Sequence, residues 1–239
     1  SGRMGPFPDG VAEPTSSQEV KDLLAWAGKE NVTVIPYGGG TSVAGHINPL
    51  PDGRPVLTLS LARLNNLLGL DRESQLATLG AGANGPRVEE LLNAEGYTLG
   101  HFPQSFELST LGGWVVTRSS GQQSLRYGRI EQMFAGGRLE TLAGTLDIPT
   151  FPASSAGPDL REMVLGSEGR LGVLTEVKVR VTRQPEVEEF RAFFLPDWAS
   201  ASAAIRELVQ LRLPLFAQGE TGHADEAEQG TGGGAEKRH

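Results

Sequence analysis

The chain has 239 residues, of which 38% are hydrophobic, 21% are charged and 32 are glycine, and its formal net charge is −8. This composition predicts an ordinary soluble globular protein with one large domain or two small ones, and it excludes an intrinsically disordered chain. Because there is no cysteine, disulfides, thiolate nucleophiles and cysteine-ligated metals are excluded. The acidic charge argues against a nucleic-acid partner, and neither a membrane span nor a signal peptide can be recognised. We therefore expect a cytoplasmic protein without a bound metal.

Two local patterns stand near the start of the sequence. The capping-box sequence Ser16-x-x-Glu19 precedes apolar residues at helical spacing, which predicts an amphipathic helix over residues 17–29. A β-branched run at residues 32–35 then predicts a buried strand that stops at Pro36.

Further apolar runs predict two strands, at residues 56–59 and 76–79. The pair Gly85-Pro86 predicts the start of a second helix, because proline is favoured in the first turn, and Gly96 ends it. This succession of elements fits a first small α/β unit over residues 9–100.

Residues 101–128 are rich in polar and turn-forming residues and show little periodicity. A long irregular stretch inside a compact domain is usually functional. Strands are predicted near residues 130–141 and 145–148, and clean alternation predicts a half-buried strand over residues 173–181. We expect a second α/β unit over residues 101–183, built around an antiparallel sheet.

The sequence changes character beyond residue 185. Alternating apolar residues predict a strand at residues 190–194, and Asp197 is placed to cap a following helix. One strand and one helix cannot bury both of their apolar faces, so residues 186–215 are expected to open a substrate or cap domain that is incomplete. Residues 217–239 lack Val, Ile, Leu, Met and aromatic residues, and we expect this tail to be disordered.

The first candidate binding motif is the run Pro36-Tyr37-Gly38-Gly39-Gly40-Thr41-Ser42, directly after a predicted strand. Three successive glycines let backbone N–H groups turn toward one point, which makes an anion nest suited to phosphate. Thr41 and Ser42 add hydroxyl donors. The spacing matches neither the G-x-G-x-x-G nor the Walker pattern. A plain glycine turn accounts for these residues equally well.

Two further stretches contain residues suited to ligand binding. From Gly100 to Ser105 and from Leu108 to Trp114, small and hydroxyl residues allow a flat or charged ligand to lie against the backbone. The run Thr117-Arg118-Ser119-Ser120-Gly121 places a guanidinium between hydroxyls, which suits a pyrophosphate or a carbonyl-rich ring. The alternative is a polar surface loop with one exposed arginine. Trp114, considered by itself, is expected to be a core residue.

Residues 165–175 place Gly166, Gly169 and Gly172 ahead of the predicted strand at 173–181. Such a turn can hold backbone amides against the edge of a ligand. A tight turn with a bulge is the alternative, and the local sequence alone favours it.

Four motifs, taken together and in order, resemble a known flavoprotein family. They are residues 36–45, 106–121, 127–131 and 166–176. The segment from about residue 9 to residue 183 resembles the FAD-binding domain of the vanillyl-alcohol oxidase and p-cresol methylhydroxylase flavoproteins. The resemblance is strongest to the alkyl-dihydroxyacetonephosphate synthase branch and its bacterial FAD-linked oxidase relatives. It implies an α+β fold, with the two α/β units as subdomains of the PCMH-type FAD-binding fold and the start of a truncated cap domain after them.

The resemblance also implies FAD as the cofactor. By similarity, residues 38–42 wrap its pyrophosphate, residues 104–110 line the flavin and ribityl chain, residues 117–120 continue that wall, and residues 168–174 close over the cofactor. The cofactor-binding residues implied in this way are Pro36, Tyr37, Gly38, Gly39, Gly40, Thr41, Ser42, Gly45, Pro103, Gln104, Ser105, Ser109, Thr110, Gly112, Gly113, Thr117, Arg118, Ser119, Ser120, Glu168, Gly169, Gly172, Val173 and Leu174.

Some relatives attach the flavin covalently through a histidine in the glycine loop. Thr41 stands at that place here, so the resemblance implies noncovalent FAD, and His46 is expected to be a surface or hydrogen-bonding residue. Arg170 departs from the family pattern, in which a small hydroxyl residue is usual. Relatives also continue into a substrate-binding cap, which suggests that the chain is truncated or read in a shifted frame near residues 214–216.

In this family the flavin accepts a hydride from a substrate, whereas in the synthase branch it traps the substrate without net redox change. No catalytic residue is assigned, and His101, Glu107 and Tyr127 are expected to be structural. We expect the FAD-binding domain of a flavin-dependent oxidoreductase or transferase. It would act on a small-molecule substrate, a hydroxy acid or a phosphorylated ketone ester, when a cap is supplied, and would dimerise through its uncovered flavin-facing side. The alternatives are a complete enzyme assembled with another chain, and a non-catalytic binding module or fragment whose cofactor site stays empty.

Overall fold

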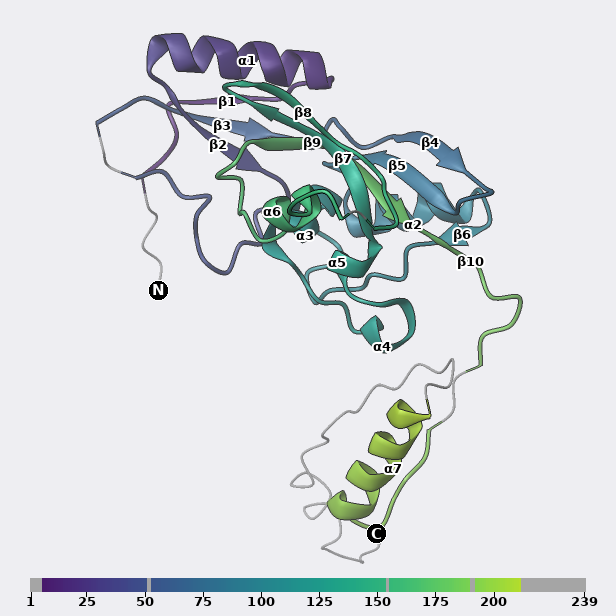
Figure 1. The fold of residues 1–239 in the computed structure, drawn as a ribbon. Coiled ribbons are helices and arrows are strands. Elements are labelled where there is room, and N and C mark those ends of the chain that lie inside the picture. The colour runs from purple at the N-terminus through teal and green to yellow at the C-terminus, as the bar shows by residue number, and fades with distance from the viewer. Residues whose placement is uncertain (1–5, 51–52, 154, 190–191, 212–239) are drawn as a thin grey trace, which may run out of the picture.

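The computed structural model describes residues 6–50, 53–153, 155–189 and 192–211. Its strands form a three-stranded sheet, a five-stranded sheet and a two-stranded pair. Figure 1 shows the three sheets in one body, with helix α1 (Ser17–Glu30) lying across the strands on one side. Helix α7 (Trp198–Gln210) lies apart from this body in Figure 1. The protein therefore has a fold of mixed helices and strands, and this part of the α+β prediction is confirmed.

Helix α1 begins where the capping pattern predicts. Ser16 Oγ accepts a hydrogen bond from the Glu19 N–H at 3.2 Å. The Glu19 carboxylate reaches one residue further back than in a usual capping box, to the Thr15 N–H at 2.6 Å. Asn31 ends the helix in the left-handed region, with φ 53°. The predicted helix is confirmed, and it buries Val20, Leu24 and Ala27.

The three-stranded sheet is parallel, with β3 (Val56–Ser60) between β1 (Gly10–Ala12) and β2 (Thr33–Tyr37). The strand predicted at residues 56–59 is confirmed. The prediction for β2 is wrong in two respects, because this strand runs through Pro36 and only Ile35 is buried. β2 is an edge strand, where a proline costs little. The edge position brings the end of β2, and the glycine loop after it, to the surface.

The five-stranded sheet is antiparallel. Its order is β4 (Leu67–Asp71), β5 (Leu76–Gly80), β9 (Val173–Arg180), β7 (Phe134–Thr141) and β8 (Gly144–Ile148). The alternating strand predicted at residues 173–181 is the central one, and the strands predicted at 76–79 and 145–148 are confirmed, whereas β4 was not predicted. Because β4 and β5 precede residue 100 and the others follow it, the strands do not group on either side of that residue as expected.

The main core lies between this sheet and helices α2 (Gly85–Asn93) and α3 (Leu111–Thr117). Helix α2 starts at the predicted Gly85-Pro86 pair, and Asn84 caps it by accepting a hydrogen bond from the Arg87 N–H at 3.1 Å. A smaller core of Val20, Leu24, Leu59, Leu61, Leu64 and Val173 lies beneath α1. Because Val173 of β9 belongs to it, the smaller core joins the parallel sheet to the antiparallel one.

Residues 101–128, expected to be irregular, contain two short helices, α3 and α4 (Ser124–Tyr127). The helical period of α3 is hidden because Gly112 and Gly113 occupy its first turns. Gly112 is required there, since an added Cβ would lie 2.8 Å from the Cβ of Ala81. The strand predicted at 130–141 starts only at Phe134, because the short helix α5 (Ile130–Met133) precedes it. A further short helix, α6 (Leu160–Val164), was not predicted.

Asp197 caps α7 as predicted, and its Oδ1 accepts a hydrogen bond from the Ser200 N–H at 2.7 Å. Helix α7 buries none of its residues. The predicted strand at 190–194 is wrong for residues 192–194, which have no regular structure, and residues 190–191 and 217–239 lie outside the described residues. Across the described ranges, no helix combines the length and the apolar character that crossing a membrane requires.

A buried carboxylate ties α2 to the chain that follows it. Glu89 accepts hydrogen bonds from Thr98 Oγ1 at 2.7 Å and from the Leu99 and Gly100 N–H groups at 3.1 Å each. Thr98 belongs to β6 (Tyr97–Thr98), which pairs with β10 (Thr182–Arg183). Glu89 therefore sets the direction in which the chain enters residues 101–105.

We predict that Glu89→Ala lowers the free energy of unfolding by about 2–4 kcal/mol, because two buried N–H donors and a hydroxyl lose a charged acceptor. Urea unfolding followed by circular dichroism measures this. Glu90→Ala is the matched control, since Glu90 is exposed and pairs with Arg87 across one helical turn, and its effect is expected to stay below about 1 kcal/mol. Equal effects of the two substitutions would contradict the role of Glu89.

Candidate cofactor-binding site

The glycine loop after β2 packs backbone against backbone on the segment that leads into α3. A Cβ added to Gly39 would lie 1.7 Å from the Leu108 carbonyl oxygen, and one added to Gly38 would lie 2.3 Å from Thr110 Oγ1. Gly40 has φ +71°, in the left-handed region that glycine adopts freely. The glycines therefore serve a tertiary contact, which a plain turn between a strand and a loop would not require.

The loop also presents its backbone donors. No N–H group from Gly38 to Ser42 donates a hydrogen bond to another residue in the described part of the chain. Ser42 Oγ accepts a hydrogen bond from the Gly45 N–H at 3.1 Å, which closes the loop on itself. A run of backbone N–H groups at one turn can form a nest for phosphate oxygens. The loop therefore has the donors that the predicted anion site requires.

A hollow of about 430 Å³ involves the loop. It is lined by Thr41, Val43, Gln104, Ser105, Ser120, Gly121 and Gln122. Thr41, the pair Gln104-Ser105, and Ser120 were implied by the family resemblance from three separate stretches of sequence. The structure brings these stretches around one space, and the lining side chains are mostly hydroxyls and amides.

The fourth motif meets the glycine loop through His46. Its Nδ1 lies 2.9 Å from Ser42 Oγ and 3.1 Å from a carboxylate oxygen of Glu168. Glu168 has a left-handed backbone, with φ 52°, and its N–H donates to the Val116 carbonyl at 2.8 Å. His46 is therefore a hydrogen-bonding residue, as expected, and it links the turn before β9 to the loop after β2.

Some expected cofactor residues do not line the hollow. Ser109 Oγ donates to the Ser105 carbonyl at 2.8 Å and accepts from Trp114 Nε1 at 2.7 Å. Thr110 Oγ1 caps α3 by accepting from the Gly113 N–H at 3.3 Å. Pro103, Gly112, Val173 and Leu174 are likewise buried. A direct contact between these residues and a cofactor stays a prediction, and Trp114 is a core residue, as expected.

The remaining expected residues lie near the hollow and contact neighbouring motifs. Tyr37 approaches the glycine loop, because a Cβ on Gly40 would lie 2.2 Å from its hydroxyl, and Gly169 faces Pro36 at 3.4 Å by the same measure. Thr117 Oγ1 donates to the Gly113 carbonyl at 2.8 Å. These contacts do not involve a cofactor, so a direct role of each residue in cofactor binding stays a prediction.

Arg118 lies at the end of α3 with a left-handed backbone, φ 54°. Its guanidinium forms an ion pair with Glu162 of α6 and does not line the hollow. The expected contact between Arg118 and polar atoms of a cofactor would have to compete with this pair or share the guanidinium with it.

Three lining residues, Val43, Gly121 and Gln122, were not among the expected cofactor residues. Gly121 and Gln122 directly follow the Ser119-Ser120 pair, and the Gln122 N–H donates to the Phe102 carbonyl at 2.9 Å. Their position after two expected residues was the available signal. Val43 is fully exposed. Its position beside the glycine loop was the only signal in the sequence that it would line the hollow.

The three residues expected to be structural differ in burial. Tyr127 packs on Gly100, where an added Cβ would lie 2.3 Å from its ring, and Glu107 is exposed. His101 is 1% exposed, and its Nε2 lies 2.7 Å from Ser119 Oγ. Burial lowers the pKa of His101 to about 4, although the negative charge of Glu131 opposes this shift. His101 is therefore neutral at pH 7.

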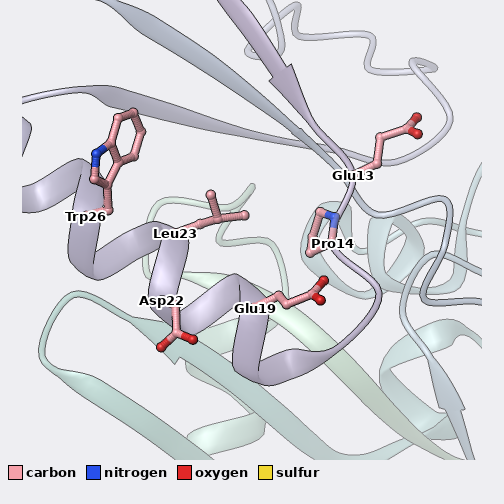
Figure 2. Close-up of a pocket in the computed structure, with 6 residues that line it drawn as sticks. All are labelled: Glu13, Pro14, Glu19, Asp22, Leu23 and Trp26. Atoms are coloured by element: carbon pink, nitrogen blue, oxygen red, sulfur yellow. The ribbon is translucent and has the colours of Figure 1, made fainter.

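A second hollow, also of about 430 Å³, lies at α1 and is lined by Glu13, Pro14, Glu19, Asp22, Leu23 and Trp26. Figure 2 shows the carboxylates of Glu13 and Glu19 on either side of Pro14, with Leu23 and Trp26 further along the helix. None of the expected cofactor residues lines it. Its carboxylates would repel phosphate, so this hollow is not a candidate for the same ligand.

We predict that Gly39→Ala destabilises the protein by about 1–3 kcal/mol or more, because the new methyl overlaps a backbone oxygen that cannot move without displacing residues 108–110. The denaturant midpoint in urea measures this. Gly69→Ala is the control, since nothing lies within 4 Å of an added Cβ and its φ is not positive, and its effect is expected to stay within about 1 kcal/mol. A Gly39→Ala variant as stable as Gly69→Ala would contradict the close packing.

The buried imidazole predicts a pH dependence of stability. The pKa of His101 is about 4 in the folded protein and about 6.5 in an unfolded chain, so between these values only the unfolded chain binds the proton. The stabilisation is complete above pH 6.5 and is lost as the pH falls toward 4, by about 3 kcal/mol in total. Urea unfolding of the wild type and of His101→Gln from pH 7 to pH 4.5 measures it. Parallel curves for the two proteins would rule out this assignment.

Comparison with known proteins identifies the family. The model of a family described as an FAD binding domain matches residues 8–147. The chain is 40% identical over 207 residues to an alkyldihydroxyacetonephosphate synthase of Dictyostelium discoideum, covering 87% of this chain and 34% of that protein. It is 33% identical over 206 residues to an uncharacterized FAD-linked oxidoreductase of Escherichia coli K12, covering 85% and 42%.

A solved structure of an alkyldihydroxyacetonephosphate synthase matches with a TM-score of 0.79 at 39% sequence identity, over 84% of this chain and 36% of that one. The chain thus spans about a third of the length of the synthases it matches. The resemblance read from the four motifs is confirmed, and so is FAD as the cofactor of the family. The chain belongs to the FAD-binding domain family of the FAD-linked oxidoreductases.

Proposed function

We propose that the chain forms the cofactor-binding half of an FAD-dependent enzyme of the alkyl-dihydroxyacetonephosphate synthase branch, and that a cap domain supplies the substrate half. The observation that carries the proposal is the convergence of three expected stretches on one hollow, with the fourth joined to the glycine loop through His46. Segments so far apart in sequence do not line one polar space as a by-product of local turns.

The residues of the hollow suit the two chemically different parts of FAD. The N–H groups of Gly38 to Ser42 would hold the pyrophosphate, because they have no partner among the described residues and point from a single loop. Gln104, Ser105, Ser120 and Gln122 would bind the polar edge of the ring system with their hydroxyls and amides. FAD, when bound, supplies the electron-accepting ring. The chain would bind this ring, orient it and exclude water from one of its faces.

The finer organisation is part of the same proposal. We infer two PCMH-type subdomains, one around the parallel sheet and one around the antiparallel sheet, and a truncated cap that begins near residue 186. The exposed apolar residues Phe193, Phe194 and Trp198 support a cap, because such side chains are normally covered by further structure. The substrate class of the synthase branch, a phosphorylated ketone ester, is proposed ahead of a hydroxy acid because the synthase relative is more similar in sequence than the oxidoreductase.

We propose noncovalent FAD. Thr41 occupies the position at which some relatives have an attachment histidine, and its hydroxyl cannot form the same bond. His46, the histidine closest in sequence, is held by Ser42 and Glu168. Nothing in its contacts requires a flavin, so hydrogen bonding accounts for this residue.

A second candidate function is a non-catalytic module in which the cofactor site stays empty. The full exposure of Val43 on the lining of the hollow favours it, because an open site excludes little water from a bound ring.

The purified protein is expected to retain about one FAD per chain after incubation with FAD and desalting, seen as flavin absorbance bands. Acid precipitation is expected to release all of the flavin into the supernatant, because the binding is noncovalent. Gly39→Ala is expected to retain much less flavin, and Gly69→Ala is the control. A folded protein that retains no flavin would refute the proposed function and favour the empty module.

A further inference from the structure

Residues 101–105 contribute to both walls of the cofactor hollow. Gln104 and Ser105 line one wall directly. Ser120, Gly121 and Gln122 also line the hollow, and two hydrogen bonds join residues 119–122 to the same segment. The Gln122 N–H donates to the Phe102 carbonyl at 2.9 Å, and His101 Nε2 lies 2.7 Å from Ser119 Oγ. Of these two bonds, only the second depends on a side chain that can titrate.

The His101 ring has close neighbours in the core and in the lining of the hollow. Its centroid lies 4.9 Å from that of Trp114, with the planes tilted by 58°. A Cβ added to Gly121 would lie 3.1 Å from His101 Nδ1 and 2.9 Å from the Phe102 nitrogen. The ring therefore lies between the core residue Trp114 and Gly121, which lines the hollow.

Among the described residues, the imidazole has a single hydrogen-bond partner, Ser119. His101 Nδ1 is fully buried and has no hydrogen-bond partner in the described part of the chain. The charge that acts on it is that of Glu131 of α5. Oε2 of Glu131 is also buried without a hydrogen-bond partner among the described residues, and its Oε1 lies 3.1 Å from Arg129 Nε. Tyr127 packs on Gly100, the residue before His101, and brings no charge at neutral pH. In a neutral ring that donates from Nε2, Nδ1 is an unprotonated acceptor, whereas a protonated ring would bury a second N–H there without an acceptor.

We propose that His101 is a positioning residue for FAD, a neutral latch that holds the wall formed by residues 119–122 in place through Ser119. This proposal rests on the proposed function of the hollow. His101 does not line the hollow, and its effect on the cofactor passes through Ser119 and the backbone of Ser120 and Gly121.

The test compares two amide side chains of different reach. Gln places its amide near the position of Nε2 and can still bond to Ser119, whereas Asn places it near Nδ1 and cannot. FAD titration followed by flavin fluorescence at pH 7.5 is expected to give a Kd for His101→Gln within about threefold of wild type. His101→Asn and Ser119→Ala are each expected to raise Kd by about 5- to 30-fold, the effect of one buried hydrogen bond. The double variant is expected to be no weaker than the worse single one, because both remove the same interaction.

The stability of each variant without FAD separates positioning from general damage. Asn and Gln variants with different Kd values at equal fractions folded, measured by circular dichroism, support the latch. Equal Kd values for wild type and His101→Asn, with wild type binding FAD, overturn the latch and leave the FAD site intact. A wild type that binds no FAD overturns both proposals. A ¹⁵N-histidine spectrum gives an independent readout, because the signal lost in His101→Gln is expected to remain neutral from pH 7 to pH 5. Titration of that signal near pH 6.5 would overturn the latch.

Discussion

The close approach of Gly39 to the Leu108 carbonyl is the contact on which the rest of the site depends. Backbone can meet backbone at this point only because the loop has no side chain there. The contact holds the loop after an edge strand of the parallel sheet against the entrance to α3, which itself packs on the antiparallel sheet through Gly112 and Ala81. The contact therefore links the loop that lines the hollow to elements of both sheets.

Buried polar groups set the second constraint. Glu89 holds the chain at residues 98–100, and His101, directly after them, meets Ser119. Residues 101–105 are thus held at their start by two buried side chains, the carboxylate of Glu89 and the imidazole of His101. Such groups cost free energy unless they are hydrogen-bonded, and this makes the direction of the segment specific.

The family relation explains which parts of the chain bear the site and which do not. All four motifs lie between residues 36 and 176, within a body that matches synthase structures closely. Beyond it, α7 and the preceding aromatic residues bury little surface. The chain spans about a third of the length of the synthases it matches.

The sequence by itself determined the elements with strong local signals: α1 and α7 with their caps, α2 after Gly85-Pro86, and the alternating strand β9. It also determined the family, because the order of four motifs does not depend on the fold being known. Only the tertiary structure decided that β2 is an edge strand through Pro36, that β4 and β5 belong to the same sheet as β7, β8 and β9, and that α3 is a helix despite its glycines. It also decided which expected residues line the hollow and that Arg118 pairs with Glu162. The physical reason is that these features arise from contacts between residues far apart in the chain, where the space a neighbour leaves, and not local periodicity, selects the conformation.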